Sequence, residues 1–384
     1  MRDVIIVGAG PAGSYLGYAL SRAGLDVLNL EEHEEIGRPV ECTGVVTKRI
    51  LEYVNTKSIA NRVHGADVYF GDKQPLHIAK NEETLIIYRD SFDKDAAGMS
   101  ISAGTDMRLG SRVRSVKRIK EAVEVEYRQL GETKTESAKI IVGADGANSM
   151  VRKELFGTFP KRVISTYQID YAYRMGDQDS VSVFLGSKFS HGFFGWAVPT
   201  GPISRVGLGT VGGGAKNYIE ALQSMLGAGQ VITVTGGPIP ISYLGRTYSD
   251  RSILVGDAAG IVKPLTGGGI YTGLVSAKHA SATIIDAFEN NNFGESFLSS
   301  YERSWKKDIG KELFVDGIVQ RVFATLSDRS LNRLFSVLSD PKMIGTINRL
   351  GDIDYPSGLI VRSLLSHPSL VFNLFRGLSG PNRY

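Results

Sequence analysis

The sequence has very little cysteine and no long apolar run. Cys42 is the single cysteine among 384 residues, which excludes an internal disulfide framework and a structural metal site built on cysteines. No stretch of about eighteen uninterrupted apolar residues occurs, so the sequence predicts no transmembrane helix. The first apolar strand begins at residue 3, which leaves no room for a secretory signal. These absences predict a reducing, cytoplasmic setting and no bound metal.

The charge is small and unevenly placed. The formal net charge is +4, and residues 299–384 hold twelve Lys and Arg against eight Asp and Glu. A basic segment can contact anionic lipid, and residues 358–375 are apolar around Arg362, His367 and Pro368. These interruptions favour a segment that lies on a membrane over one that spans it; a packed helical cap is the alternative. No nucleic-acid-binding motif is present, so no nucleic-acid partner is expected.

The most informative stretch is the N-terminus. Residues 4–7 are apolar β-formers, typical of a buried parallel strand, and they lead into Gly8-x-Gly10-x-x-Gly13. The first glycine permits a tight turn, the second lets the backbone approach a pyrophosphate, and the third lets the helix pack on the strand. A second strand ends at Glu31, where a carboxylate can accept hydrogen bonds from ribose hydroxyls. The stretch predicts dinucleotide binding, because an ordinary glycine-rich turn does not explain Glu31.

The remaining pattern predicts an α/β protein, α+β overall, in three parts. Period-2 strands between residues 163 and 211 predict an antiparallel sheet with one face covered. Helices are expected at 215–226, from 270 to about 289, and over most of the last 85 residues. The predicted parts are a discontinuous Rossmann-like domain (1–61, 89–155 and 236–298), an antiparallel-sheet substrate domain (62–88 and 156–235) and a helical C-terminal region (299–384).

Three separated segments match one known pattern. They are the opening fingerprint with Glu31, the run Gly-Ala-Asp-Gly-Ala-Asn-Ser at 143–149, and Gly256-Asp257-Ala-Ala-Gly with Pro-Leu-Thr-Gly-Gly-Gly-Ile at 264–270. Together they resemble the FAD-dependent group that includes aromatic hydroxylases, flavin halogenases and geranylgeranyl reductases. The resemblance covers about residues 1–300 and implies FAD as the cofactor in a p-hydroxybenzoate hydroxylase-type fold.

The resemblance also implies which residues contact FAD. Asp257 follows a strand, where it can accept a hydrogen bond from a ribityl hydroxyl. Backbone N–H groups of Gly268, Gly269 and Ile270, at a helix start, can meet the flavin pyrimidine O2. Arg89 is a planar donor for phosphate or ribityl oxygens, with a surface salt bridge as the alternative. Further contacts are implied at Ala12, Cys42, Thr43, Val45 and Val113, whereas Asp145 is expected to hold a turn.

Two motifs distinguish the members of this group. Residues 38–44, Arg-Pro-Val-Glu-Cys-Thr-Gly, resemble the Pro-x-x-Cys-Gly loop of geranylgeranyl reductases, with Thr43 in place of glycine. The resemblance implies that Cys42 lies against the flavin ring; a small buried residue is the alternative.

The second motif is Phe-Gly-Trp-Ala-Val-Pro-Thr at 194–200, followed by Gly207. It resembles the reductases' Tyr-x-Trp-x-Phe-Pro-Lys…Gly motif. Trp196, Pro199 and Gly207 match, while Phe194, Val198 and Thr200 depart. Alternation places Phe194, Trp196 and Val198 on one face, which suits either a prenyl groove or an ordinary core strand.

The resemblance implies an FAD-dependent reductase that saturates C=C bonds of geranylgeranyl chains in archaeal membrane ether-lipid biosynthesis. Cys42 is the candidate catalytic residue, as a thiol donor or a positioning group. No second Rossmann fingerprint is present, so the sequence does not decide how FAD is reduced; NAD(P)H and ferredoxin are the two candidate electron donors. The alternatives are an FAD-dependent monooxygenase of the aromatic-hydroxylase type and an electron-transfer flavoprotein that reduces a quinone.

Overall fold

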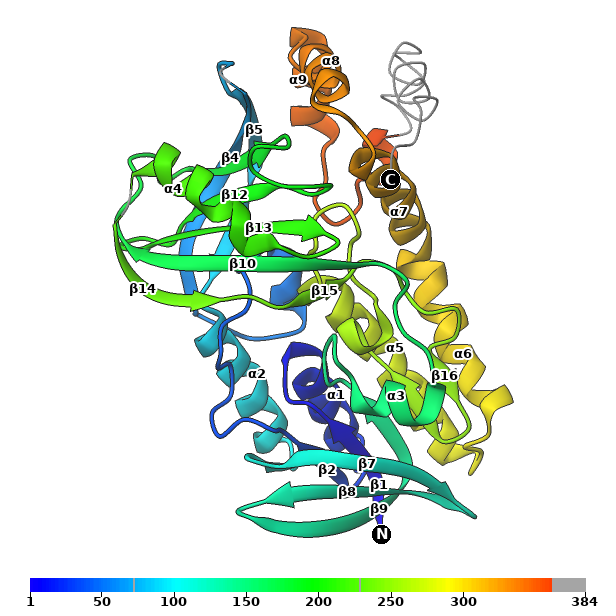
Figure 1. The fold of residues 1–384 in the computed structure, drawn as a ribbon. Helices are drawn as coiled ribbons and strands as arrows, with labels where there is room; N and C mark the ends of the chain where they lie inside the picture. Colours follow the sequence, from blue (N-terminus) through cyan, green and yellow to red (C-terminus); the bar gives the residue numbers. More distant parts are fainter. Residues whose placement is uncertain (72, 228, 361–384) are drawn as a thin grey trace.

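A computed structural model describes residues 1–71, 73–227 and 229–360, and it contains two large sheets joined by helices (Figure 1). The first sheet has eight strands in the order β16-β17-β9-β1-β2-β6, and the arm β7-β8 continues it from β9. Its central strands run parallel, with β1 between β2 and β9. Its strands are β1 (Arg2–Val7), β2 (Val27–Leu30), β6 (Asp106–Arg108), β7 (Arg112–Ile119), β8 (Ala122–Gln129), β9 (Glu132–Gly143), β16 (Tyr248–Ser249) and β17 (Ser252–Leu254).

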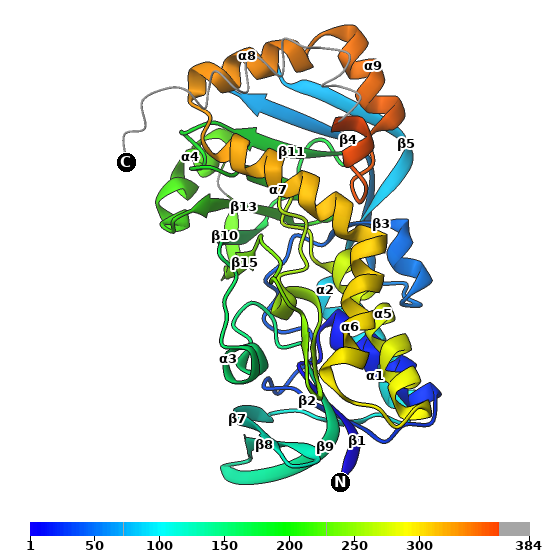
Figure 2. The same ribbon diagram turned by 90° about the vertical axis from the view of Figure 1, so that its right-hand side faces the viewer.

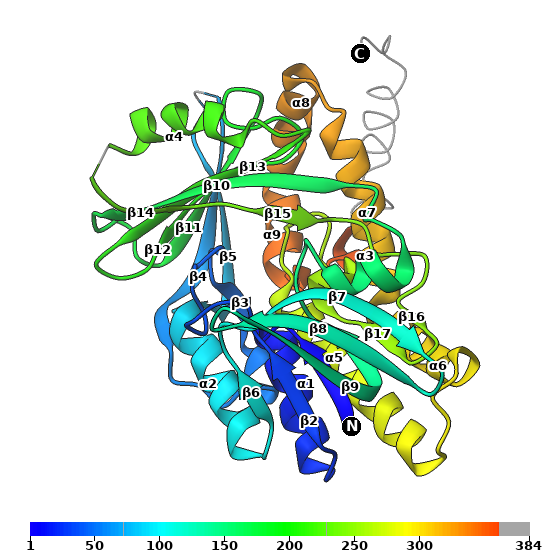
Figure 3. The same ribbon diagram turned by 60° about the horizontal axis from the view of Figure 1, so that its bottom comes forward.

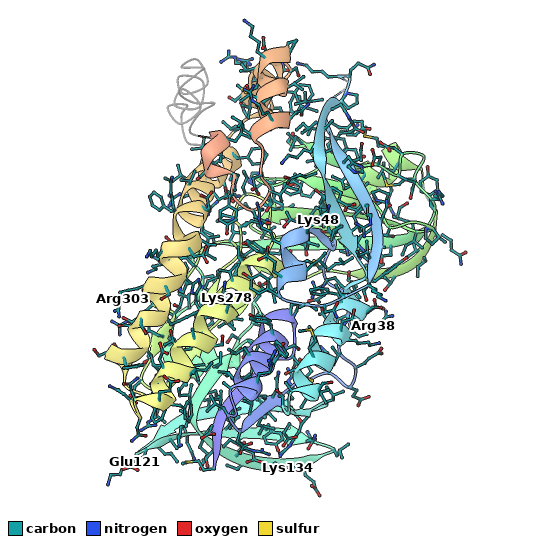
Figure 4. The ribbon with its side chains drawn as sticks, turned by 180° about the vertical axis from the view of Figure 1, so that it is seen from behind. Arg38, Lys48, Glu121, Lys134, Lys278 and Arg303 are labelled. Atoms are coloured by element: carbon teal, nitrogen blue, oxygen red, sulfur yellow. The ribbon has the colours of Figure 1, made fainter. Side chains whose placement is uncertain are left out.

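Helices from distant parts of the chain cover the first sheet. α1 (Pro11–Arg22) packs against both α2 (Arg89–Ser102) and α5 (Ile270–Glu289). Figure 4 shows this helical side from behind, with the exposed Lys278 on α5 and Arg303 on α6 (Glu295–Trp305). The predicted strand–turn–helix–strand unit is confirmed, because residues 4–6 of β1 are fully buried and pair in parallel with β2.

The second sheet has nine strands in the order β14-β10-β13-β12-β11-β4-β5-β3, with β15 also on β10. The predicted antiparallel pattern holds except between β4 and β11, which pair in parallel. α4 (Ile219–Leu226) packs on one face, and the helix predicted over 215–226 begins as a 3-10 turn, Ala215–Tyr218. The strands are β3 (Val45–Thr47), β4 (Ile59–Phe70), β5 (Leu76–Ile87), β10 (Val163–Ala172), β11 (Ser180–Leu185), β12 (Gly195–Pro199), β13 (Ser204–Val211), β14 (Gln230–Thr235) and β15 (Pro238–Pro240).

The C-terminal part is helical as far as it is described. α6, a π-helical turn (Lys306–Gly310) and α7 (Lys311–Ala324) form one column that runs alongside both sheets (Figure 2). α8 (Asp328–Leu338) buries Leu331 and Phe335 against β4 and β5, and α9 (Pro341–Leu350) follows. Within the described ranges no helix is long and apolar enough to cross a membrane. Most of the stretch 358–375, for which membrane contact is predicted, lies outside the described residues.

Candidate FAD site

The glycine turn after β1 is built for close backbone contact. Gly8 has φ +98°, and a Cβ there would lie 2.4 Å from the Ala144 carbonyl oxygen. A Cβ on Gly13 would lie 2.1 Å from the Gly8 carbonyl oxygen, so both positions need glycine for the fold itself. Gly10 differs, because nothing lies within 4 Å of a Cβ built there. The open space at Gly10 is at the N-terminus of α1, where a pyrophosphate would bind.

Glu31, the residue after β2, is only 8% exposed and braces this turn. Its Oε2 accepts a hydrogen bond of 2.7 Å from the Ala9 amide. Its Oε1 accepts from the His33 amide at 3.0 Å and lies 2.6 Å from His33 Nδ1. A carboxylate has about four acceptor positions, so Glu31 can hold the turn and still accept from a ribose hydroxyl.

Asp257 lies in the 3-10 turn Gly256–Ala259 and faces the start of α5. A Cβ built on Gly269 would lie 2.7 Å from Asp257 Oδ1. Burial raises the pKa of Asp257 to about 6, while the nearby Arg89 and Arg152 cations act in the opposite direction. Among the described residues no group donates a hydrogen bond to this carboxylate. The Asp257 side chain is partly exposed, so its carboxylate is open to a ligand, and a ribityl hydroxyl could donate a hydrogen bond to it.

Arg89 opens α2 and pairs with Asp93 one turn later. Its Nε and Nη2 donate to the two Asp93 oxygens at 2.9 and 2.8 Å. Burial opposes the charge, but Asp93 and the neighbouring Cys42 raise the pKa of Arg89 above its ordinary value. A salt bridge is therefore present, but it is largely buried and not the surface pair that we considered as the alternative. FAD contact by Arg89 stays a prediction, favoured by its position between Cys42 and Asp257.

The loop before α5 joins the two sheets. Gly267 has φ +73°, and a Cβ there would lie 3.2 Å from Ile239 and 3.5 Å from Phe193, both beside the second sheet. The residues that follow, Gly268–Ile270, form the N-terminus of α5, whose first N–H groups have no partner within the helix. A flavin pyrimidine bound at these amides would therefore lie next to the apolar face of the second sheet.

The Cys42 loop is held by an arginine that we did not predict from the sequence. Arg205 on β13 donates from Nη1 to the carbonyl oxygens of Cys42 and Thr43 at 3.0 and 3.1 Å. Arg205 and Asp170 on β10 are 5% and 6% exposed and form a bidentate pair at 2.8 and 3.0 Å. Gly44, at φ +79°, lets the loop pass the Ile87 carbonyl oxygen. The second sheet thus holds the backbone directly after the Cys42 side chain.

The predicted substrate face is an apolar aromatic surface. Trp196 is 8% exposed, and its indole N–H donates to Gln168 at 3.2 Å. A Cβ on Gly207 would lie 2.7 Å from the Trp196 ring, so Gly207 leaves the space that the ring fills. Phe194 and Val198 join Trp196 in one cluster, as alternation predicts. Pro199 ends β12 and is buried.

A segment close to residue 350 also reaches the site, and we did not predict it from the sequence. Asp354 accepts hydrogen bonds from Thr47 Oγ1, from Arg49 at 3.2 Å and from Lys263 Nζ at 2.8 Å. Asp352 forms a bidentate pair with Arg49 at 2.9 and 2.7 Å. Lys263 directly precedes residues 264–269, the loop before α5 at which we expect the flavin and which we call the flavin loop. Thr47 follows the Cys42 loop. The segment therefore ties both loops together from outside the predicted nucleotide domain.

The other predicted residues have more local surroundings. Ala12 lies where α1 meets α5 near Gly273. Val45 opens β3 beside the aromatic cluster, and Val113 is buried in β7. Their contacts with FAD stay predictions. Asp145 accepts hydrogen bonds from the first turn of α3 (Met150–Phe156), which is the structural role expected for it.

The residues present fit FAD. The open space at Gly10 and the Asp257 carboxylate follow β1 and β17, two strands of the first sheet, and α5 begins beside Asp257. Figure 3 shows α1 and α5 next to this sheet. The open space, the carboxylate and the start of α5 suit, in order, a pyrophosphate, a ribityl chain and a flavin pyrimidine.

Comparison with known proteins agrees with this geometry. A family model for an FAD binding domain matches residues 1–172. The chain is 31% identical to digeranylgeranylglycerophospholipid reductase 1 of Methanococcoides burtonii over 88% of each chain. It is 33% identical to an uncharacterised protein of Methanocaldococcus jannaschii over 98% of each.

Solved structures give the same result. A geranylgeranyl bacteriochlorophyll reductase-like protein from Thermoplasma acidophilum matches with a TM-score of 0.87 and 26% identity, over 98% of this chain and 99% of that one. The halogenase PltM in complex with FAD matches at 0.71 and 16% identity over 99% and 93%, a likeness of fold alone. Sequence and structure agree: this FAD-dependent oxidoreductase belongs to the geranylgeranyl reductase family.

Proposed function

We propose that the protein saturates C=C bonds of geranylgeranyl chains in archaeal-type membrane ether lipids. The supporting observation is that the loop leading to the N-terminus of α5 touches Phe193 and Ile239 through Gly267. An apolar cluster of the second sheet thus adjoins the place where flavin would react. The relatives named digeranylgeranylglycerophospholipid reductase support the same substrate class.

Bound reduced FAD would supply a hydride. An isolated prenyl double bond has no neighbouring carbonyl to activate it, so the protein must align the chain and exclude water. Phe193, Trp196 and Val198 are 2–8% exposed and suit this task.

Cys42 is our candidate to position the alkene or to deliver a proton. It is partly exposed, and Arg205 fixes its backbone. A Cys42→Ala variant should keep FAD and lose alkene reduction. If the variant reduces prenyl chains at the wild-type rate, Cys42 has no such role.

The electron donor and the membrane contact belong to the same proposal. NAD(P)H or a ferredoxin would reduce the flavin. On α7, Phe314 and Ile318 are 56% and 40% exposed, one turn apart, which suits a helix that touches lipid. Co-sedimentation with anionic vesicles should fall in a Phe314→Ser/Ile318→Ser variant; unchanged sedimentation would exclude this face as the contact.

The decisive experiment uses dithionite-reduced, FAD-loaded protein and digeranylgeranyl phospholipid, followed by mass spectrometry. We expect mass gains in steps of two hydrogens, and none with FAD-free protein. Oxygen consumption with NADPH and no mass gain would instead indicate a monooxygenase. Reduction of a quinone analogue with the prenyl chains unchanged would indicate an electron-transfer flavoprotein.

A further inference from the structure

The inner face of α7 is unusually polar. Asp316 and Gln320, one turn apart, are 1% and 0% exposed, whereas Phe314 and Ile318 face outward. An amphipathic helix normally does the reverse. Burying a carboxylate is costly unless it is paired or neutral, so this arrangement needs a physical reason.

Asp316 and Gln320 lack the donor that their oxygens require. Within the described residues, neither Asp316 carboxylate oxygen meets the geometry of a hydrogen bond, and the same is true of Gln320 Oε1. The Leu265 backbone amide is near enough to lower the pKa of Asp316, but by less than burial raises it. Gln320 Nε2 is committed to the Gly192 carbonyl oxygen at 3.1 Å. Side chains four residues apart on a helix are neighbours. A proton on Asp316 would supply the missing donor, and burial raises the pKa of Asp316 to about 7.

The charged groups around Asp316 do not neutralise it. Lys263 lowers the pKa of Asp316 and Glu312 raises it, both less than burial does. Lys263 Nζ already donates to Asp354 at 2.8 Å and to the Ile353 carbonyl oxygen at 3.0 Å. Glu312 accepts from the Ser357 amide and hydroxyl group. The single Lys263 cation therefore serves Asp354, and an ionised Asp316 would remain uncompensated.

The same cation lies beside the flavin loop. Lys263 Nζ is 3.2 Å from a Cβ built on Gly268, at the N-terminal side of α5. A Cβ on Gly317, next to Asp316, would lie 3.8 Å from Pro264, which opens that loop. Negative charge on the flavin pyrimidine and negative charge on Asp316 would therefore compete for Lys263. Like charges that share a site raise each other's proton affinity.

We propose that Asp316 is a proton-binding site coupled to the flavin: it takes up a solvent proton when flavin reduction brings negative charge to the loop, and releases it on reoxidation. A nicotinamide-class donor gives the flavin a hydride, or a ferredoxin-class donor gives it two electrons while solvent supplies one proton; in either case a second proton, from solvent, binds Asp316. When the flavin gives a hydride to one alkene carbon, the other carbon gains a proton. Loss of the proton from Asp316 supplies this second hydrogen to the overall reaction. This last step rests on the proposed function, whereas proton uptake does not.

The test measures the flavin midpoint potential against pH in FAD-loaded protein without substrate. Each proton bound per two electrons adds about 30 mV per pH unit to the slope. Above pH 7, where Asp316 is mostly ionised in the oxidised protein, we expect the wild-type slope to exceed that of Asp316→Asn by up to one proton. Asp316→Glu should keep the steeper slope, and so should the control Asp308→Asn, whose carboxylate is exposed and pairs with His279. Parallel slopes for wild type and Asp316→Asn would overturn the proposal.

A second measurement uses only the wild-type protein, so it does not depend on whether a variant folds. Redox difference infrared spectra of the wild type should show a carboxylic acid C=O band that appears on reduction near pH 7.5. Absence of this band would also overturn the proposal. Because neither experiment contains a prenyl lipid, both can succeed even if the proposed substrate is wrong.

Discussion

Substitutions of Arg205 test how the second sheet restrains the Cys42 loop. Arg205→Gln leaves Asp170, which is 6% exposed, without its counter-ion. Breaking a buried pair on one side costs about 3–5 kcal/mol. The double variant Asp170→Asn/Arg205→Gln removes both charges, so it should regain most of that loss. Urea unfolding measures this difference.

Opening of the Cys42 loop should not follow the free energy of unfolding in these two variants. Both variants remove the Nη1 donor to the Cys42 and Thr43 carbonyl oxygens, and hydrogen bonds from a charged group contribute about 1.5–3 kcal/mol. Local opening should then become roughly tenfold to hundredfold more frequent. Cys42 is the only cysteine, so the rate of thiol labelling in native buffer reports this loop alone.

The double variant decides whether the Arg205 hydrogen bonds restrain the Cys42 loop. Regained stability with fast Cys42 labelling would confirm that Arg205 holds the loop. Labelling at the wild-type rate in the double variant would refute the reasoning, because the Arg205 hydrogen bonds would then not restrain the loop. Asp170→Asn alone is the matched control: it lowers stability but keeps the Arg205 donor, so its labelling should change least.

Three further predictions follow from the same structure. Gly207→Ala should lose about 1–3 kcal/mol of unfolding free energy through overpacking against Trp196, whereas Gly98→Ala, with nothing within 4 Å, should not; equal urea midpoints would contradict this. FAD affinity, measured by fluorescence, should fall as pH drops through about 6, where Asp257 becomes protonated, and Asp257→Asn should bind weakly at every pH. Asp316 has a folded pKa of about 7 against an ordinary 3.8, so its protonation stabilises the folded state most below pH 4. This stabilisation is lost as pH rises to 7, by about 4 kcal/mol of unfolding free energy. The unfolding free energy of Asp316→Asn should depend less on pH, and identical unfolding curves at pH 5 and 8 for both proteins would argue against this.

Local pattern was sufficient to predict the adenosine end of the site. Gly8, Gly10, Gly13 and Glu31 lie within one strand–helix–strand unit, where the turn geometry depends on neighbouring residues alone. The shared face of Phe194, Trp196 and Val198 also follows from alternation within one strand. These features needed no knowledge of which strands pair.

Contacts between distant segments could not be read in this way. Asp170 and Arg205 become partners only through the register of β10 and β13; the available signal was one acid and one base in two otherwise uncharged strands. Thr47 and Asp354 are 307 positions apart. The parallel pairing of β4 with β11 depends on a similar long-range choice. On α7, hydropathy alone would bury Phe314 and expose Asp316, the opposite of what the structure has.

The contact between Lys263 and Asp354 has a consequence for synthesis on the ribosome. The strands and loops that surround the flavin are complete once α5 has emerged, yet Lys263 then has no counter-ion beside the start of that helix. Asp354 is synthesised about ninety residues later, and Thr47 and Arg49 also donate hydrogen bonds to its carboxylate. We expect a nascent chain to form a settled cofactor pocket only after residue 354 has left the exit tunnel.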